Sequence, residues 1–444
     1  MRLNVWTVFC EQEAAGDGIV WRRYTMKDSK TGSISRRDFA RLSAMAGFSV
    51  LASRRASAET NSDTLKVGLL GCGNRGTGAA AQMLLGNENV KLIAMADLFE
   101  DRLRSSRRRI SNDKDERVSS KYAVEDDHCF VGWDAYTKIL ETDIDILLEG
   151  TLPYSRSKHV EAAVNAGKHV FTEKPVAVDP VGVRRLLAAA KRSEEKGLSF
   201  VAGTQRRHQK PYVETIKKIH DGAIGEILSA RAYWCGGLPF VRARKPRYSD
   251  LEYRIRNWIN YCWVSGDNIV EQHIHNLDVI NWAMDAHPVK VFASGGRAWK
   301  PPEERFGDMY DHFSCDYEYA NGVHMISFSR HWNDVDGGVF EEVVGTKGKS
   351  SCADMGSEGE DPYVQEHIDL VKSIRKTGPY LNEGVRVAET TLTAIMGRMS
   401  AYTGKVVTWD EAMNSDLSLV PDVLDFDREY PVGPIPSPGG GKLL

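Results

Sequence analysis

Short apolar runs alternate with segments of helical periodicity over residues 64–202. The apolar runs are compact, which is typical of strands buried on both faces of a parallel sheet. These runs cover residues 64–70, 90–96, 144–148, 169–172 and 199–202. The helical segments between them cover residues 78–85, 159–166 and 182–196. Because strands and helices alternate, the pattern predicts an α/β fold with a doubly wound parallel sheet.

The pattern changes after residue 227, where hydrophobic and polar residues begin to alternate with a period of two. Such alternation predicts strands with one buried and one exposed face. The alternating runs cover residues 228–234, 312–319, 323–329 and 339–344. The turn-forming pairs Asn321-Gly322 and Gly337-Gly338 separate consecutive runs and predict hairpins. Residues 364–374 and 385–403 have helical periodicity, so the second half is expected to form an α+β domain.

The first sixty residues follow neither pattern. Arg36 and Arg37 lie in a twin-arginine sequence, residues 42–52 form a short apolar run, and residues 56–58 form an Ala-Ser-Ala cleavage site. These features in this order are typical of a Tat export signal. We therefore expect a leader that directs the protein to the periplasm. The alternative is an amphipathic basic helix that packs on the body of the protein.

Composition excludes several classes of protein. Hydrophobic residues make up 42% of the 444 residues and charged residues 27%, which is close to the globular average. The formal net charge is −3, so we expect no nucleic-acid partner. No long apolar stretch follows residue 60, so we expect no membrane span in the body. The seven cysteines are scattered without zinc-site spacing, so we expect no metal site.

A glycine-rich loop lies between the first predicted strand and the first predicted helix, in the order Gly71, Gly73 and Gly76. Gly71 allows a tight turn, Gly73 lets the backbone approach a pyrophosphate, and Gly76 lets the helix pack on the strand. A bound pyrophosphate would lie at the N-terminus of the following helix, where N–H groups are free, and Asn74 and Arg75 are expected to contact the cofactor. The loop therefore predicts a dinucleotide site.

Asp97 strengthens this prediction because it ends the second predicted strand, where an acidic residue binds the adenosine ribose hydroxyls. A carboxylate there repels a 2′-phosphate, so NAD is favoured over NADP. The arginines at 102, 104 and 107–109 could favour NADP instead, although a solvated helix face explains them better. Thr151 and Pro153 follow another strand end and are expected to face the same crevice.

Four motifs carry a resemblance to a known family. They are the glycine loop 71–76, the Gly-Lys-His-Val-Phe-Thr-Glu-Lys-Pro sequence 167–175, residues 203–207 and residues 266–282. Together they resemble the Gfo/Idh/MocA (glucose–fructose oxidoreductase / inositol dehydrogenase) family. The resemblance implies a Rossmann domain that binds NAD, followed by a domain with an open, mostly antiparallel sheet. It also implies a small carbohydrate or cyclitol substrate and homo-oligomers that form through that sheet.

Four segments follow from these patterns. Residues 1–58 are the leader, within which residues 1–25 are interpreted as an upstream translation artefact because Met26 offers a natural start. Residues 63–208 are expected to form the NAD-binding Rossmann domain, and residues 209–420 the α+β domain for substrate and oligomerisation. Residues 421–444 are rich in proline and glycine and are expected to form an extended or disordered tail.

Within the resemblance, Lys174 stabilises a developing alkoxide and His275 is the general base. Glu271 stands where the family has aspartate, which keeps the charge but adds a methylene group. The substrate site is expected to comprise Lys174, Arg206, Glu271 and His275. Glu173, Lys174 and Gln205 are expected to contact the cofactor. Residues 242–263 either supply aromatic and basic contacts to a sugar ring or form a packed surface loop and helix.

Spacing alone allows another interpretation of the motif at residues 266–282. Glu271, His275 and Asp278 stand at i, i+4 and i+7, so one helix would place them on one face. Such a face is more often solvated than catalytic, and only the resemblance favours catalysis. Asp278 is expected to be a structural partner. His273 would point away from His275 on that helix, so it is expected to be packed or exposed, and a His-x-His metal site is disfavoured.

The sequence therefore predicts an NAD-dependent oxidoreductase that acts on a secondary hydroxyl of a sugar, polyol or cyclitol and holds its cofactor tightly. One alternative is a redox-neutral enzyme that uses bound NAD to cleave a glycoside on the same scaffold. Another alternative, from a different class, is a non-catalytic sugar- or nucleotide-binding protein. The presence of Lys174, Glu271 and His275 favours an enzyme over this last alternative.

Overall fold

The computed structural model describes residues 64–431 and 435–440, and the leader prediction lies outside these residues. The first half forms a six-stranded parallel sheet of order β3-β2-β1-β4-β5-β6, which confirms the predicted doubly wound fold. Its strands are β1 (Leu65–Leu70), β2 (Val90–Asp97), β3 (Cys129–Val131), β4 (Ile146–Glu149), β5 (His169–Thr172) and β6 (Phe200–Ala202). Chain order reverses between β1 and β4, and ligands bind at such switch points.

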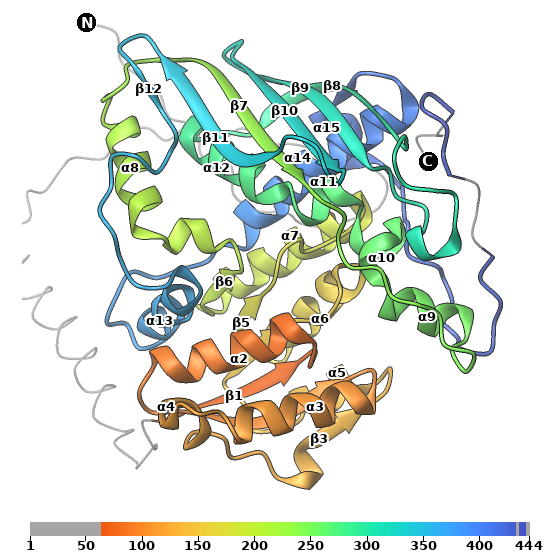
Figure 1. The fold of residues 1–444 in the computed structure, drawn as a ribbon. Helices are drawn as coiled ribbons and strands as arrows, with labels where there is room; N and C mark the ends of the chain where they lie inside the picture. The colour runs from red at the N-terminus through yellow and green to blue at the C-terminus, as the bar shows by residue number, and fades with distance from the viewer. Residues whose placement is uncertain (1–63, 432–434, 441–444) are drawn as a thin grey trace, which may run out of the picture. The chain divides into compact units, whose positions relative to one another are not determined.

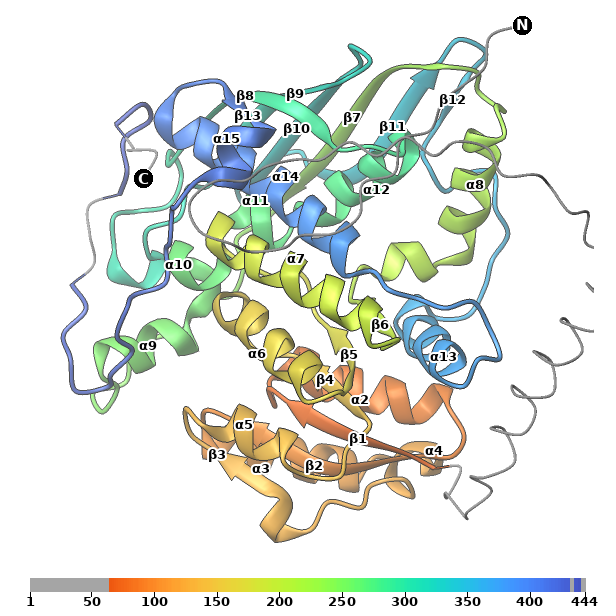
Figure 2. The ribbon, with the colours of Figure 1, turned by 180° about the vertical axis from the view of Figure 1, so that it is seen from behind.

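Helices cover both faces of this sheet, with α2 and α3 on one face and α6 and α7 on the other (Figures 1 and 2). The helices are α2 (Asn74–Gly86), α3 (Glu100–Ser111), α4 (Glu116–Ser119), α5 (Ala135–Leu140), α6 (Pro153–Asn165) and α7 (Pro180–Glu195). Three of them, α2, α6 and α7, begin earlier than the sequence predicted. Gly73 is the N-cap of α2, and Pro153 occupies the first turn of α6, a position where proline costs no hydrogen bond.

The second half contains a seven-stranded sheet of order β12-β11-β7-β10-β9-β8-β13. Its strands are β7 (Ile227–Gly236), β8 (Pro288–Gly296), β9 (His312–Tyr319), β10 (His324–His331), β11 (Gly338–Gly345), β12 (Lys349–Ser350) and β13 (Val407–Thr408). Neighbouring strands are antiparallel except β7 and β10, which are parallel. The sheet is therefore mostly antiparallel, as the family resemblance implied.

One predicted hairpin is wrong. Asn321-Gly322 does join β9 to β10 in a hairpin, with Gly322 at a φ of 81°. Gly337-Gly338 does not form a second hairpin, because β11 pairs with β7 rather than with β10. The edge of β10 is already occupied by β7, so the chain must cross to the far side of β7 before it can pair.

Helices cover one face of the second sheet, where α12 (Ile274–Met284) and α14 (Gly384–Thr403) pack (Figure 1). The remaining helices are α8 (Lys210–His220), α9 (Asp250–Arg256), α10 (Cys262–Ser265), α11 (Asn268–Glu271), α13 (Pro362–Ile374) and α15 (Trp409–Asn414). Among them α13 returns to the first half and packs on α2. No helix within the described residues is long and apolar enough to cross a membrane.

The described part of the C-terminal tail is an extended segment that packs on the body, shown in dark blue in Figures 1 and 2. Leu424, Phe426 and Tyr430 join an apolar cluster built mainly by α9 and α10. The Phe426 ring lies 6.0 Å from that of Phe99 and 5.2 Å from that of Trp133. The tail therefore reaches the ends of strands β2 and β3.

Candidate active site

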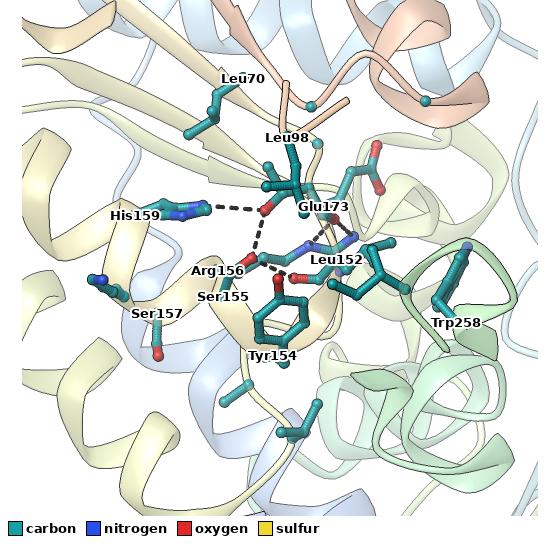
Figure 3. Close-up of a pocket in the computed structure, with 18 of the residues that line it drawn as sticks. Leu70, Leu98, Leu152, Tyr154, Ser155, Arg156, Ser157, His159, Glu173 and Trp258 are labelled. Atoms are coloured by element: carbon teal, nitrogen blue, oxygen red, sulfur yellow. Dashed lines mark hydrogen bonds between the residues drawn. The ribbon is translucent and has the colours of Figure 1, made fainter. Parts of the chain in front are cut away.

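A cavity of about 860 Å³ opens at the carboxyl ends of the parallel strands (Figure 3). This volume is within the range of small-molecule and cofactor sites. Most of the expected site residues line this one cavity. They are Gly71, Gly73, Asn74, Arg75, Asp97, Thr151, Glu173, Lys174, Gln205, Glu271 and His275.

The glycine loop has the geometry that its sequence predicted. Gly71 has a φ of 96°, and a Cβ there would lie 2.5 Å from the Thr151 backbone nitrogen. A Cβ at Gly76 would lie 1.9 Å from the Gly71 carbonyl oxygen. A Cβ at Gly73 would meet no atom within 4 Å, so open space lies above this residue. Gly73 also lacks a side chain to cap α2, which leaves the helix N-terminus available to an anion.

Two backbone N–H groups hold the Asp97 side chain in place beside the glycine loop. Its carboxylate accepts hydrogen bonds from the Cys72 N–H at 2.6 Å and the Phe99 N–H at 2.8 Å. Burial raises the pKa of Asp97, and these two hydrogen bonds oppose that shift. Asp97 lines the cavity beside the glycine loop, so the residues present fit the pyrophosphate and the adenosine ribose of a dinucleotide.

Lys174 and Glu271 meet inside the cavity, although they come from different halves of the chain. The Lys174 Nζ donates to the Glu271 carboxylate at 3.2 Å and also to the Glu271 carbonyl oxygen. Their side chains are 11% and 13% exposed, so the pair is shielded from water but still reachable from the cavity. The ammonium group is therefore fixed where a substrate oxygen could approach it.

His275 lies beside this pair and lines the same cavity. Burial lowers the pKa of His275 well below its ordinary value, and the charges of Lys174 and Arg206 lower it further. Its Nδ1 has no hydrogen-bond partner among the described residues. The imidazole is therefore neutral near pH 7 and able to accept a proton.

A single helix does not carry Glu271 and His275, contrary to the sequence prediction. Helix α11 ends at Glu271 and α12 begins at Ile274, so the chain breaks its helical path between them. His273 is fully buried in this break, and its Nε2 lies 2.6 Å from the Ser327 Oγ on β10. Its packed position agrees with the sequence prediction.

Asp278 is a structural partner, as the sequence indicated. It is 1% exposed, and its carboxylate accepts hydrogen bonds from Arg207 at 2.8 Å and 3.0 Å. Arg386 and Thr390 donate to the same carboxylate at 3.1 Å and 2.9 Å. This network joins α12 to α14 and to the chain after β6, away from the cavity lining.

Three expected site residues do not line the cavity. Gly76 is buried under the loop and contributes only close packing. Pro153 is buried in the first turn of α6, so Thr151 faces the cavity and Pro153 does not. Arg206 forms an ion pair with Glu341 on β11, which also accepts a hydrogen bond from Asn276 at 2.6 Å. Arg206 thus does not form part of the cavity wall, and its effect on the site is that its charge lowers the pKa of His275.

Sequence reasoning missed two groups of lining residues. The first is Arg156 and His159 on α6, together with the buried Glu149 that both contact. Glu149 ends an apolar strand, and a carboxylate at this position was a sequence signal that it belongs to the site. The second group comes from the start of the tail and the residues just before it, where apolar residues in a proline-rich segment were the available signal. Its lining residues are Ser418, Val420, Pro421, Asp422 and Leu424.

Comparison with known proteins gives a consistent result. Residues 65–200 match a family sequence model described as "Oxidoreductase family, NAD-binding Rossmann fold". Residues 212–351 match the model of the GFO/IDH/MocA C-terminal domain. Together these matches cover most of the described chain.

Similar curated proteins include the myo-inositol 2-dehydrogenase of Thermotoga maritima, 26% identical over 231 residues, which are 52% of this chain and 58% of that enzyme. The 2,7-anhydro-N-acetylneuraminate hydratase of Mediterraneibacter gnavus is 26% identical over 250 residues, 54% of this chain and 60% of the hydratase. The chain thus matches about three fifths of each relative's length.

Among solved structures, a scyllo-inositol dehydrogenase from Lactobacillus casei with bound NAD(H) and scyllo-inositol superposes with a TM-score of 0.60. Sequence identity is 18%, and the match covers 78% of this chain and 99% of that one. At this identity the likeness concerns the fold.

Proposed function

The chain belongs to the Gfo/Idh/MocA oxidoreductase family, and on this premise we propose that it oxidises a secondary hydroxyl of a sugar, polyol or cyclitol with NAD. The observation that carries the proposal is the Lys174–Glu271 pair beside a neutral His275. All three residues line the cavity that also contains the glycine loop and Asp97. A proton acceptor and a fixed cation thus face the same space as the dinucleotide site.

Different residues of the cavity would bind the cofactor, accept the proton and stabilise the alkoxide. Gly71, Gly73 and the N-terminus of α2 would hold the pyrophosphate, and Asp97 would bind the ribose hydroxyls. NAD, when bound, supplies the hydride acceptor. His275 accepts the hydroxyl proton, and the Lys174 ammonium stabilises the alkoxide that develops. Glu271 keeps this ammonium in place through its carboxylate and its carbonyl oxygen.

We further propose that the cofactor is retained between turnovers. The start of the tail and the residues just before it contribute Ser418, Val420, Pro421, Asp422 and Leu424 to the cavity wall. Leu419 N–H donates to Asp179 at 2.9 Å, and Tyr430 N–H donates to Asp250 at 3.0 Å, so hydrogen bonds hold this wall segment on both sides. A dinucleotide that leaves on this side must displace the tail. Retention also suits the proposed periplasmic location, where no pool of free NAD is expected.

A redox-neutral reaction is the second candidate. The similarity to a hydratase from Mediterraneibacter gnavus supports it, since that relative's name describes no net oxidation. The same His275 and Lys174 would serve a transient oxidation that is later reversed. In that case the protein would convert its substrate without any lasting accumulation of NADH.

Homo-oligomers that form through the second sheet are also proposed. The face of this sheet opposite α12 and α14 exposes several large apolar side chains, an arrangement that marks interaction surfaces. The residues exposed on this face include Phe292, Ile326, Phe328 and Phe340. Light scattering on the purified protein measures the mass, and substitution of Phe292 and Phe328 by serine should lower it.

The function is tested by a screen of polyols, inositols and glycosides followed by mass spectrometry, without added NAD. A product two mass units lighter than its substrate supports the oxidation. A dehydrated or cleaved product without net oxidation supports the second candidate. A protein that binds NAD but converts no compound in the screen would favour the binding-protein alternative.

A further inference from the structure

Arg156 is a buried cation beside the proposed reaction centre. It comes from the first turns of α6, is 5% exposed, and lines the cavity together with His159 and Glu173 (Figure 3). Burial of a guanidinium is costly unless carbonyl oxygens and a counter-charge satisfy it. The contacts of Arg156 therefore indicate what it stabilises.

The guanidinium spans two loops that follow neighbouring strands. Its Nη1 donates to the Pro175 carbonyl oxygen at 2.9 Å, directly after the Lys174 peptide. Its Nε and Nη2 donate to the Thr151 carbonyl oxygen at 3.0 Å and 2.6 Å. Thr151 follows β4 and Pro175 follows β5. Because the guanidinium is planar and rigid, it fixes the spacing between the two loops.

A buried carboxylate balances the charge of Arg156. The Glu149 Oε2 lies 3.4 Å from the Arg156 Nε, and Glu149 is fully buried at the end of β4. Burial would raise the pKa of Glu149, but the hydrogen bond from His159 and the charge of Arg156 outweigh it and leave the pKa lowered. Glu149 is therefore ionised near pH 7, and the two loops are joined by a paired buried charge.

We propose that Arg156 is a positioning residue for Lys174, an inference that rests on the proposed function. Pro175 is the residue next to Lys174, so the hydrogen bond to its carbonyl oxygen fixes the backbone from which the lysine side chain extends. The Lys174 Nζ then reaches Glu271. Displacement of a catalytic group by about 1 Å can cost about 10²-fold in rate. Arg156 thus acts on the rate of reaction through Lys174.

The test compares Arg156→Lys with Arg192→Lys. Lysine keeps the charge of Arg156 but cannot span both carbonyl oxygens, whereas Arg192 pairs with Glu161 between helices and does not line the cavity. With myo-inositol as the probe, Arg156→Lys should lower kcat by about 30-fold or more while KM and NAD affinity change less than about threefold. Arg192→Lys should change none of these. Unchanged kcat, or an equal loss of NAD affinity, would overturn the proposal.

A double-variant experiment separates positioning from a general loss of structure. If Arg156 acts through Lys174, Arg156→Lys should have little further effect on kcat in the Lys174→Ala background. Full additivity of the two losses would contradict the proposal. If Arg156→Lys does not fold, the double variant Glu149→Gln with Arg156→Gln takes its place in the experiment. This double variant removes both buried charges together. If neither protein retains the wild-type circular dichroism spectrum, Arg156 is a structural residue and the proposal fails.

A measurement without substrate distinguishes failure of this inference from failure of the proposed function. Competitive acetylation with acetic anhydride reports the reactivity of Lys174 relative to the exposed Lys191. Arg156→Lys should change this ratio by about threefold or more, because Lys174 moves relative to Glu271. Arg192→Lys should leave it unchanged. An unchanged ratio in Arg156→Lys overturns the inference even if the protein oxidises polyols, and a changed ratio supports it even if myo-inositol is not a substrate.

Discussion

Lys174 and Glu271 form an ion pair at 3.2 Å between the end of β5 and the end of α11. The pair connects the parallel sheet to the helices that cover the second sheet. The Glu271 carboxylate in the second half of the chain thus fixes the position of the Lys174 ammonium group in the first half. The proposed reaction depends on this contact, and so does the first prediction.

Lys174→Ala should lower kcat by about 10²-fold or more, because the alkoxide loses its fixed cation. NAD affinity should change little, since the glycine loop and Asp97 remain in place. Steady-state kinetics and a separate NAD titration check both parts. Lys158→Ala is a suitable control, because Lys158 lines the same cavity on α6 but does not contact Glu271. A variant with normal kcat would remove Lys174 from the mechanism.

His275→Ala should also lower kcat by about 10²-fold or more, because the hydroxyl proton loses its acceptor. His273→Ala should instead lower stability, since it removes the contact with Ser327, and should leave kcat nearly unchanged. Thermal unfolding and kinetics on the two variants separate these effects. If His273→Ala is inactive and His275→Ala is active, the assignment of the base is reversed.

The pH dependence follows from the lowered pKa of His275. Only the neutral imidazole accepts a proton, so oxidation should persist below the ordinary histidine pKa of about 6.5 and fall only at lower pH. The same shift affects stability: the folded state binds fewer protons than the unfolded state, so stability is present above about pH 6.5 and is lost as the pH falls. An activity loss centred at or above about pH 6.5 would contradict the lowered pKa.

NAD should bind about tenfold tighter than NADP or better, a difference of about 1.4 kcal/mol, because the Asp97 carboxylate repels a 2′-phosphate. Asp97→Asn should narrow this ratio. Calorimetric titration with both cofactors measures it, and Asp113→Asn, a substitution outside the cavity lining, is the control. Equal affinities in the wild-type protein would exclude the ribose role of Asp97.

Release of the cofactor should depend on the tail. Phe426→Ala with Leu424→Ala removes the ring contacts with Phe99 and Trp133 and one lining side chain. The rate of NADH release, followed by fluorescence in a chase experiment, should rise about tenfold or more. Glu429→Ala, at an exposed tail position, should leave the rate unchanged. Equal release rates in all three proteins would show that the tail does not retain the cofactor.

Local signals explain why the cofactor half was predictable. The strand β1, the glycine loop and Asp97 each depend on a short stretch of sequence whose residue types determine its geometry. Gly71 and Gly76 are needed because any side chain would collide with backbone atoms. The family resemblance then identified Lys174, Glu271 and His275 as one site, although spacing alone did not.

The remaining features depend on contacts between distant segments. The helix is interrupted between Glu271 and His275, where His273 is buried against Ser327, and no local signal predicts this break. The crossing of β11 to the far side of β7 depends on which sheet edge is free. The tail has no periodicity, so its place in the cavity wall follows only from packing against residues far away in the sequence.

The most direct test of the account is the absorbance of the purified protein at 340 nm after addition of a panel of polyols and cyclitols under exclusion of other oxidants. Denaturation of a second sample measures how much nicotinamide dinucleotide the protein carries. We expect close to one dinucleotide per chain and a rise in absorbance with at least one compound. Lys174→Ala should carry the same cofactor and show no rise. The proposed function would be contradicted if the purified protein carries no dinucleotide. It would also be contradicted if the absorbance of Lys174→Ala rises as much as that of the wild-type protein.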